Sequence, residues 1–347
     1  MSVATLTACS PGTDTAGTGE SATTTSSRLD TIKSRGRLLC GVEGSIPGFS
    51  FVDSSGVYSG LDVDVCRAVA AAVFGESENI DDKIEYRNLD STERFTALAG
   101  GEVDMLSRNT TWTSSRDSAG GNALEFAPTT FYDGQGMMVT AASGAQELTD
   151  LAGVSICVET GTTTELNLAD RMRELNVQYT ELKFQDSDAT YAAYAEGRCE
   201  AVTSDLSQLA ARRTTLPNPS DHVLLDTVMS KEPLGPATVN GDSAWFDVVK
   251  WVTYGLIQAE EFAITQEGVD AALTSENPEI RRFLGVEGDL GTQLGLSNDF
   301  MVHAIKAVGN YGEVFERNVG TETPLELERG LNSLWTEGGL MYSPPFR

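Results

Sequence analysis

The chain has 347 residues, and 24 Lys and Arg against 51 Asp and Glu give it a formal net charge of −27. That length suits two domains of about 150 residues, and 40% hydrophobic with 22% charged residues is typical of a folded globular protein. A surface this acidic repels phosphate backbones and anionic lipid head groups, which argues against nucleic-acid binding and electrostatic attachment to membranes. The only histidines, His222 and His303, lie far apart in sequence. We therefore expect no metal site, no cofactor and no histidine-dependent catalytic triad.

The first 27 residues are expected to combine the remnant of an export signal with a tether. Residues 6–9, Leu-Thr-Ala-Cys, resemble the lipobox at which bacterial lipoprotein signals are cut and the cysteine, here Cys9, is acylated. The basic region and the longer apolar stretch of a secretory signal do not precede them, so either the true start lies upstream or the match is chance. Residues 10–27 are mostly Ser, Thr and Gly without a large apolar side chain, which predicts a flexible tether.

Short apolar runs then alternate with amphipathic stretches in each half of the chain, a pattern that predicts largely parallel sheets covered by helices. In the first half we expect a strand at 38–42, a helix between Gly60 and Gly75, a strand at 84–88, a helix from Asp90 or Ser91 through Ala99, and a strand at 103–107. In the second half we expect a strand at 154–158, a helix at 163–175, a strand at 179–184, a helix at 188–196 and a strand at 200–203.

The two halves also share a sequence repeat. Ala-x-Ala-x-Gly-x-x-Asp at 97–104 returns as Ala-x-Ala-x-Gly-x-x-Glu at 193–200, and each copy is a helix end, a glycine stop and an acidic residue that enters a strand. The repeat indicates two lobes of one architecture, although unrelated α/β units also reuse this turn. Segments 132–139 and 230–239, which place glycine or proline beside apolar residues, are the expected crossings between lobes.

After the second crossing, the chain is expected to return to the first lobe, because three strands alone leave the last 110 or so residues without a core to pack on. An apolar stripe from Trp245 to Ile257 predicts a long helix, and shorter helices are expected near 269–273, 279–284, 299–308 and 325–335. The expected domains are lobe one at 28–133 and 236–347 with a helical C-terminal extension, lobe two at 140–230, and hinges at 134–139 and 231–235.

Four cysteines besides Cys9 form an even set, without any C-x-x-C spacing. One pair falls in each half: Cys40 with Cys66, and Cys157 with Cys199. The tether points to an exported protein and so to an oxidising compartment, which favours two disulfides within the lobes. Four buried free thiols are the alternative.

Three polar clusters follow the carboxyl ends of predicted strands, where open α/β sheets bind ligands. In the first, at 109–116, neutral donors from Asn109 and Thr111 accompany Arg116, whose planar guanidinium suits a carboxylate. The alternative is a capped turn with a solvent-facing arginine.

The second cluster opens a helix at Thr162 and Thr163, where free N–H groups favour a small anion. Ordinary capping would explain these residues equally well, and without a following lysine nucleotide phosphates are not expected. The third cluster contains Asp205, which could receive an ammonium group or cap the helix toward Arg213. Together the clusters match the carboxylate and ammonium of an α-amino acid.

A series of motifs from about Arg37 to the C-terminus resembles the periplasmic amino-acid-binding proteins of ABC importers, bacterial solute-binding protein family 3, and most closely their general L-amino-acid-binding branch. The motifs are Leu-Asp-Val-Asp at 61–64, Arg-Phe-x-Ala-Leu at 94–98, Gly-x-Val-Asp at 101–104, Asn-Thr-Thr-Trp-Thr at 109–113 through Arg116, Tyr-Asp-Gly-Gln-Gly at 132–136, Gly-Thr-Thr-Thr-Glu-Leu at 161–166, Lys-Glu-Pro-Leu-Gly-Pro at 231–236 and Gly-Gly-Leu-Met-Tyr at 338–342.

The resemblance implies an α/β, two-lobed type II periplasmic-binding-protein fold, each lobe a mixed, mostly parallel sheet flanked by helices, with the ligand in the interlobe cleft. It places the carboxylate-gripping arginine at Arg116, its polar neighbours at Asn109 and Thr111, and the ammonium-binding acid at Asp205. The second lobe's contacts fall on Thr162 and Thr163. Shorter relatives carry an acidic residue and an aromatic after the first strand, where this chain has Glu43 and Ile46, and this departure leaves the preferred amino acid open.

We therefore expect an extracytoplasmic, monomeric binding protein that captures L-amino acids, with a broad preference for polar ones, and delivers them to a membrane permease. It would lie in the periplasm or at the outer face of the cytoplasmic membrane, held there only by a lipid anchor at Cys9. A lyase or dehydratase on the same scaffold is the alternative, although Asp205 and Glu43 are the only evident titrating groups near Arg116. A receptor's sensor lobe is less favoured, because the longest apolar run, 68–74, is far too short to cross a bilayer.

Overall fold

The computed structural model describes Met1 and residues 27–75 and 78–347. Cys9, predicted to be lipidated, lies outside the described part, and so does the predicted tether over 10–27 except for Ser27. Within the described part, no helix combines the length and the apolar character needed to cross a bilayer.

Lobe one is built on a five-stranded sheet of order β5-β1-β6-β15-β7. β1 pairs in parallel with β5 and β6, whereas β15 runs antiparallel to β6 and β7. A small antiparallel sheet, β2-β3-β4, follows β1. The elements are α1 (Arg28–Arg35), β1 (Leu38–Val42), β2 (Ser45–Ile46), β3 (Ser50–Val52), β4 (Tyr58–Ser59), α2 (Leu61–Phe74), η1 (Ile80–Lys83), β5 (Ile84–Asn88), α3 (Arg94–Ala99), β6 (Met105–Leu106), α4 (Ser114–Asp117), β7 (Leu124–Phe126) and β15 (Ala237–Val239).

Helix α2 is the central helix of lobe one, and glycines set both its ends as predicted. Gly60 has a φ of 126°, and a Cβ there would lie 2.1 Å from the carbonyl oxygen of Phe49, so only glycine fits. Gly75, with a φ of 65°, donates its N–H to the carbonyl of Ala71, which closes the last turn. Nearly every residue between them is buried.

Lobe two is built on a second five-stranded sheet, of order β11-β10-β12-β9-β13. β10 is parallel to β11 and β12, and β9 is antiparallel to β12 and β13. Both sheets are therefore mixed, as the resemblance implied. The elements are β9 (Gln135–Thr140), η2 (Ala141–Ser143), η3 (Leu148–Leu151), β10 (Ser155–Glu159), α5 (Thr163–Glu174), β11 (Thr180–Phe184), α6 (Ser187–Ala195), β12 (Ala201–Asp205), α7 (Leu206–Arg213), η4 (Pro219–Asp221) and β13 (His222–Leu224).

The sequence repeat marks the same turn in both lobes. The glycine of each copy adopts a left-handed φ, of 75° and 73°. In lobe one the carboxylate of Asp104 accepts a 2.7 Å hydrogen bond from the backbone N–H of Leu39. In lobe two Glu200 accepts a 2.8 Å bond from the N–H of Ser155. Each acidic residue thus ties the helix-to-strand turn to the strand beside it.

The chain passes between the lobes along two paired strands, β8 (Phe131–Asp133) and β14 (Glu232–Leu234), which are antiparallel. β9 starts at Gln135, directly after the first crossing, and its backbone is paired with β12. Of the hinge expected at 134–139, residues 135–139 therefore form part of a strand of the second sheet.

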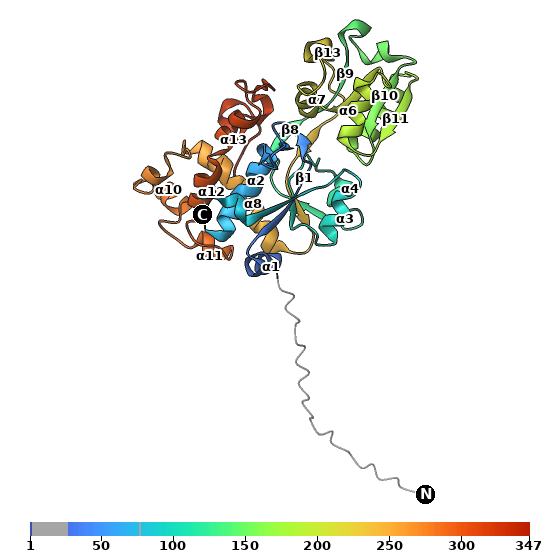
Figure 1. Cartoon of the computed structure of the whole chain (residues 1–347). Helices are drawn as coiled ribbons and strands as arrows, with labels where there is room; N and C mark the ends of the chain where they lie inside the picture. Colours follow the sequence, from blue (N-terminus) through green and yellow to red (C-terminus); the bar gives the residue numbers. More distant parts are fainter. Residues whose placement is uncertain (2–26, 76–77) are drawn as a thin grey trace.

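The C-terminal third returns to lobe one, where β15 joins the first sheet and helices α8, α12 and α13 pack on α2 (Figure 1). Trp245 is fully buried and donates its indole N–H to the carbonyl of Asp104. The elements after β15 are α8 (Ser243–Glu261), α9 (Val269–Ala272), α10 (Pro278–Phe283), α11 (Leu290–Gln293), α12 (Phe300–Val308), α13 (Tyr311–Asn318), η5 (Gly330–Asn332) and η6 (Trp335–Glu337).

One helix prediction in this region is wrong. The expected helix at 325–335 is absent, because Glu326 and Gly330 adopt positive φ values of 51° and 49°, which an α-helix cannot contain. α13 occupies the preceding segment instead and starts at a capping box formed by Asn310 and Glu313.

Both predicted disulfides are present. Cys40 of β1 is bonded to Cys66 of α2, and Cys157 of β10 is bonded to Cys199, which precedes β12. Each bridge therefore lies within one lobe, and all four cysteines are buried.

Candidate functional site

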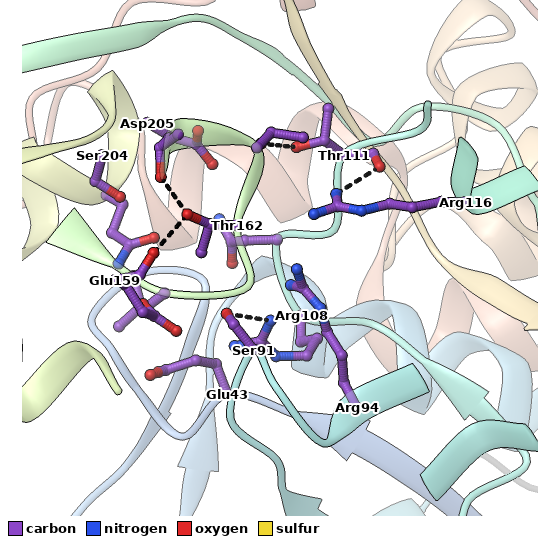
Figure 2. A pocket seen from close by; sticks show the side chains of 15 residues that line it. Glu43, Ser91, Arg94, Arg108, Thr111, Arg116, Glu159, Thr162, Ser204 and Asp205 are labelled. Carbon is purple, nitrogen blue, oxygen red and sulfur yellow. Dashed lines mark hydrogen bonds between the residues drawn. The ribbon is translucent and has the colours of Figure 1, made fainter. Parts of the chain in front are cut away.

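A cavity lies between the lobes, at the carboxyl ends of β1, β6, β10 and β12. Figure 2 shows the arginines of lobe one on one side of it and the residues of lobe two opposite. All six predicted ligand-binding residues line this cavity: Asn109, Thr111, Arg116, Thr162, Thr163 and Asp205. The other lining residues are Glu43, Ile46, Ser91, Arg94, Arg108, Glu159, Thr164, Ser204 and Gln208.

Arg116 lies in the short helix α4 and points into the cavity. Thr113 caps this helix by accepting the N–H of Arg116, so the expected capped turn is present. The side chain is nevertheless buried. Its Nη1 donates a 2.8 Å hydrogen bond to the carbonyl of Thr111, and the guanidinium carbon lies 5.3 Å from the ring centre of Phe95. Burial lowers the pKa of Arg116 to about 10, which leaves the group charged at neutral pH.

Helix α5 begins at the cavity wall of lobe two. Thr162 caps it by accepting the N–H of Glu165 at 3.1 Å and donates its own proton to the carbonyl of Glu159. Thr163 donates to Glu232 at 2.9 Å. The expected helix cap is therefore present at Thr162. The capped N-terminus of α5 also lines the cavity.

Asp205 ends β12 and stands at the start of α7, but its side chain makes no capping hydrogen bond. The capping alternative is therefore wrong. The residue is buried, and its Oδ1 has no hydrogen-bond partner among the described residues. Burial and the nearby carboxylates of Asp133 and Glu232 raise its pKa well above the usual value, so Asp205 would gain from a cationic partner.

Hydrogen bonds between the lobes close the cavity. Gln185 of lobe two donates to Asp90 of lobe one at 3.0 Å, and Arg212 donates to the carbonyl of Ser45 at 2.8 Å. The two lobes are therefore in contact around the site.

Two buried arginines of the site, Arg94 and Arg108, were not predicted. Arg94 is the first residue of α3, in the connection that follows β5, and Arg108 comes one residue beyond Ser107 after the end of β6. The sequence did offer a signal for Arg108, because this residue directly precedes Asn109, the first residue of the predicted polar cluster at 109–116. Asn109 itself has a φ of 52°, and neither its Oδ1 nor its Nδ2 has a partner in the described part of the chain.

Glu43, where the family pattern departs, is partly buried and accepts hydrogen bonds from the N–H and hydroxyl of Ser45 at 2.6 and 2.8 Å. Burial raises its pKa. Over the described ranges, no group of three or more His, Cys, Asp or Glu side chains could hold a metal ion.

Comparisons with known proteins place the chain in a family. Residues 38–263 match the family model of bacterial extracellular solute-binding proteins, family 3. The chain is 51% identical to the general L-amino acid-binding periplasmic protein AapJ of Rhizobium johnstonii over 92% of each chain. It is also 51% identical to the glutamate/glutamine/aspartate/asparagine-binding protein BztA of Rhodobacter capsulatus, over 92% of this chain and 94% of that one.

A solved structure extends the likeness to the fold. The ABC transporter periplasmic binding protein from Brucella ovis with glutathione bound is 47% identical, covers 93% of this chain and 100% of its own, and has a TM-score of 0.89. The chain thus belongs to the bacterial extracellular solute-binding proteins of family 3.

Proposed function

We propose that this protein captures L-amino acids in the cleft between its lobes and delivers them to the membrane permease of an ABC importer. One observation carries the proposal: buried polar atoms without partners converge on one cavity from both lobes. In the described residues these include Nε of Arg94 and Arg108, both amide atoms of Asn109, and Oδ1 of Asp205. Buried polar groups are normally paired, so a polar ligand would complete the site.

The charges of the cavity suit a zwitterion. Arg116 would bind the α-carboxylate with Asn109, and Asp205 would bind the α-ammonium. Thr111 would line the site beside them, since its hydroxyl proton already goes to Glu232. Thr162 and Thr163 would add contacts from the N-terminus of α5. Each charged hydrogen bond contributes about 1.5 to 3 kcal/mol net, so several of them would offset the desolvation of the ligand.

The relatives support both the ligand class and the role. AapJ is named as a general L-amino-acid-binding protein, and BztA is named for glutamate, glutamine, aspartate and asparagine. Both are binding proteins, so this chain is a binding protein and not an enzyme, and the dehydratase alternative is set aside. Glutathione in the Brucella ovis structure makes a γ-glutamyl peptide a second ligand to test.

We further propose lobe one at 28–133 and 236–347 and lobe two at 140–230 together with β9, with hinge motion at the paired crossing strands β8 and β14. AapJ is named as a periplasmic protein and the Brucella ovis protein as a periplasmic binding protein. We propose that this chain also works in the periplasm, as a monomer anchored to the membrane through Cys9.

Titration calorimetry with the twenty L-amino acids and glutathione tests the function, with NMR spectra of each mixture as a check on chemistry. We expect stoichiometric binding of a subset of amino acids and unchanged ligand signals after release. Binding of none of them, or the growth of a product signal, would overturn the proposal.

A further inference from the structure

We infer that Arg94 and Arg108 form a second anion-binding subsite in this cavity, which recognises the side-chain carboxylate of the ligand and makes acidic L-amino acids the preferred class. This inference rests on the proposed function, in which Arg116 binds the α-carboxylate. Figure 2 shows both arginines beside Ser91 in the wall that lobe one contributes.

Arg94 is a buried cation that forms no ion pair in the described part of the chain. Its residue is 2% exposed, its Nε has no partner, and its single hydrogen bond to a protein group, from Nη2 to the carbonyl of Gly161, is 3.5 Å long, all within the described residues. Removing a guanidinium from water without a paired anion is expensive. An anion in the cavity would therefore gain a strong, well-oriented partner.

Arg108 is in the same condition. It is 3% exposed, its Nε is unpartnered, and Nη1 donates only a 3.4 Å hydrogen bond to the hydroxyl of Ser91. Across the described part of the chain, neither arginine forms an ion pair, although Arg67, Arg212 and Arg329 all do. Two neighbouring guanidinium groups thus present unused donors to one cavity.

Nearby carboxylates attract both arginines, Glu159 and Asp205 acting on Arg94, and Glu43 and Asp62 on Arg108. Within the described residues, however, none of them forms an ion pair with either arginine. Glu43 directs both carboxylate oxygens to Ser45, and Glu159 makes no ion pair within the described residues. The pKa of Arg94 lies well below its usual value because of burial and because Arg108 and Arg116 repel it. A ligand with one carboxylate would pair only with Arg116, whereas the second carboxylate of a dicarboxylic ligand would also pair with Arg94 and Arg108.

The geometry allows one small molecule to reach both subsites. The guanidinium carbons of Arg94 and Arg116 lie 4.7 and 5.3 Å from the centre of the same ring, that of Phe95. Their separation therefore cannot exceed these two distances combined. Phe95 also restrains both groups by cation–π contact, which keeps the two subsites at a fixed spacing.

Titration calorimetry with L-glutamate, L-glutamine and L-norvaline tests the subsite, since norvaline has the carbon skeleton of glutamate with a methyl group in place of the side-chain carboxylate. We expect wild-type protein to bind glutamate at least about ten-fold more tightly than norvaline, with glutamine between them. Arg94→Gln and Arg108→Gln should each weaken glutamate binding by about ten-fold or more and change norvaline binding by less than about three-fold.

Arg87→Gln provides the matched control, because Arg87 is a largely exposed arginine on β5 that pairs with Glu85; it should leave all three affinities unchanged. Norvaline bound as tightly as glutamate, or variants that weaken both ligands equally, would overturn the inference while amino-acid binding stands. Failure of every amino acid to bind would instead overturn the proposed function. If one arginine variant does not fold, the ligand ranking of the wild-type protein and the other variant still decide.

Discussion

Arg116 donates a 2.8 Å hydrogen bond from Nη1 to the carbonyl oxygen of Thr111, five residues earlier in the same loop. The hydroxyl of Thr111 in turn donates a 2.6 Å bond to Oε2 of Glu232 on the crossing strand β14. These bonds hold the guanidinium in place, and among the described residues it donates no other hydrogen bond, which leaves its remaining donors for a ligand. Such preorganisation lowers the entropic cost of binding.

Arg116→Ala is therefore expected to abolish ligand-induced thermal stabilisation. A ligand at one hundred times its Kd stabilises the native state by about 2.7 kcal/mol, and this gain should disappear with the carboxylate partner. The melting temperature without ligand should stay nearly unchanged, because the substitution removes a buried cation that forms no ion pair among the described residues. Differential scanning fluorimetry with and without L-glutamate measures both quantities.

Arg173→Ala is the control for this experiment, because Arg173 lies on the exposed face of α5. It should keep the full ligand-induced shift. A shift that survives in Arg116→Ala would remove Arg116 from the binding site.

Asp205 should couple ligand binding to proton release. Burial and the carboxylates of Asp133 and Glu232 raise its pKa in the free protein, and an ammonium partner would lower it again. The bound state then holds fewer protons, so affinity should rise with pH between the bound and free pKa values of Asp205. Calorimetry in buffers of different ionisation enthalpy counts the protons released.

Asp205→Asn should weaken binding and remove this component of the proton release, since the amide does not titrate. If wild-type protein and Asp205→Asn release the same number of protons, the coupling does not come from Asp205.

The strands and most helices could be predicted because their signals are local. β1 and β5 have the predicted bounds, and the starts and stops of α2 follow from two glycines. The expected helix at 325–335 failed because apolar spacing alone does not show that Glu326 and Gly330 take positive φ values. Antiparallel pairing of β9 and β15 is a tertiary feature, and local patterns do not carry it.

The site was predictable to the extent that strand ends define it. The sequence placed Asn109, Arg116 and Asp205 at such ends, and the structure brings them to one cavity. Arg94 was not predicted because an arginine in the first turn of a helix is usually exposed. Its contact with Gly161 of lobe two is a tertiary feature that local sequence does not show. The alternatives, a solvent-facing Arg116 and a helix-capping Asp205, could be rejected only from the burial and hydrogen-bond partners that the structure shows.

The two disulfides should each stabilise the fold by about 3 to 4 kcal/mol in the chain-entropy model, because they close segments with sequence separations of 26 and 42 residues. Replacing either cysteine pair by alanine should therefore lower the midpoint of urea unfolding. All four cysteines are buried, so reduction of the native protein should be slow. Unfolding curves with and without reductant, together with thiol counts, measure these effects.

A variant without either disulfide serves as the control, because its unfolding midpoint should not respond to reductant. An unchanged midpoint in both single-pair variants would contradict the stabilising role.

Asp62 should make the free protein less stable as pH rises from about 4 to about 7. Its carboxylate accepts hydrogen bonds from the N–H of Asn109 and the hydroxyl of Ser107, and Arg108 also favours its charge. Burial outweighs these contributions and raises the pKa of Asp62 from 3.8 to about 7. In this window the folded state keeps a proton that the unfolded state has released, so deprotonation favours unfolding.

Asp62→Asn can place its amide oxygen opposite the N–H of Asn109 and its NH2 group opposite the hydroxyl of Ser107, which can accept a hydrogen bond, and the substitution removes the titration. The fall of the unfolding free energy with pH should therefore become shallower by up to about 1.4 kcal/mol per pH unit in this window. Glu43, Asp133 and Asp205 have raised pKa values of the same sign, so only the difference between wild type and variant reports on Asp62. Urea unfolding at several pH values gives that difference, and parallel curves for the two proteins would show that Asp62 is already charged in the folded state.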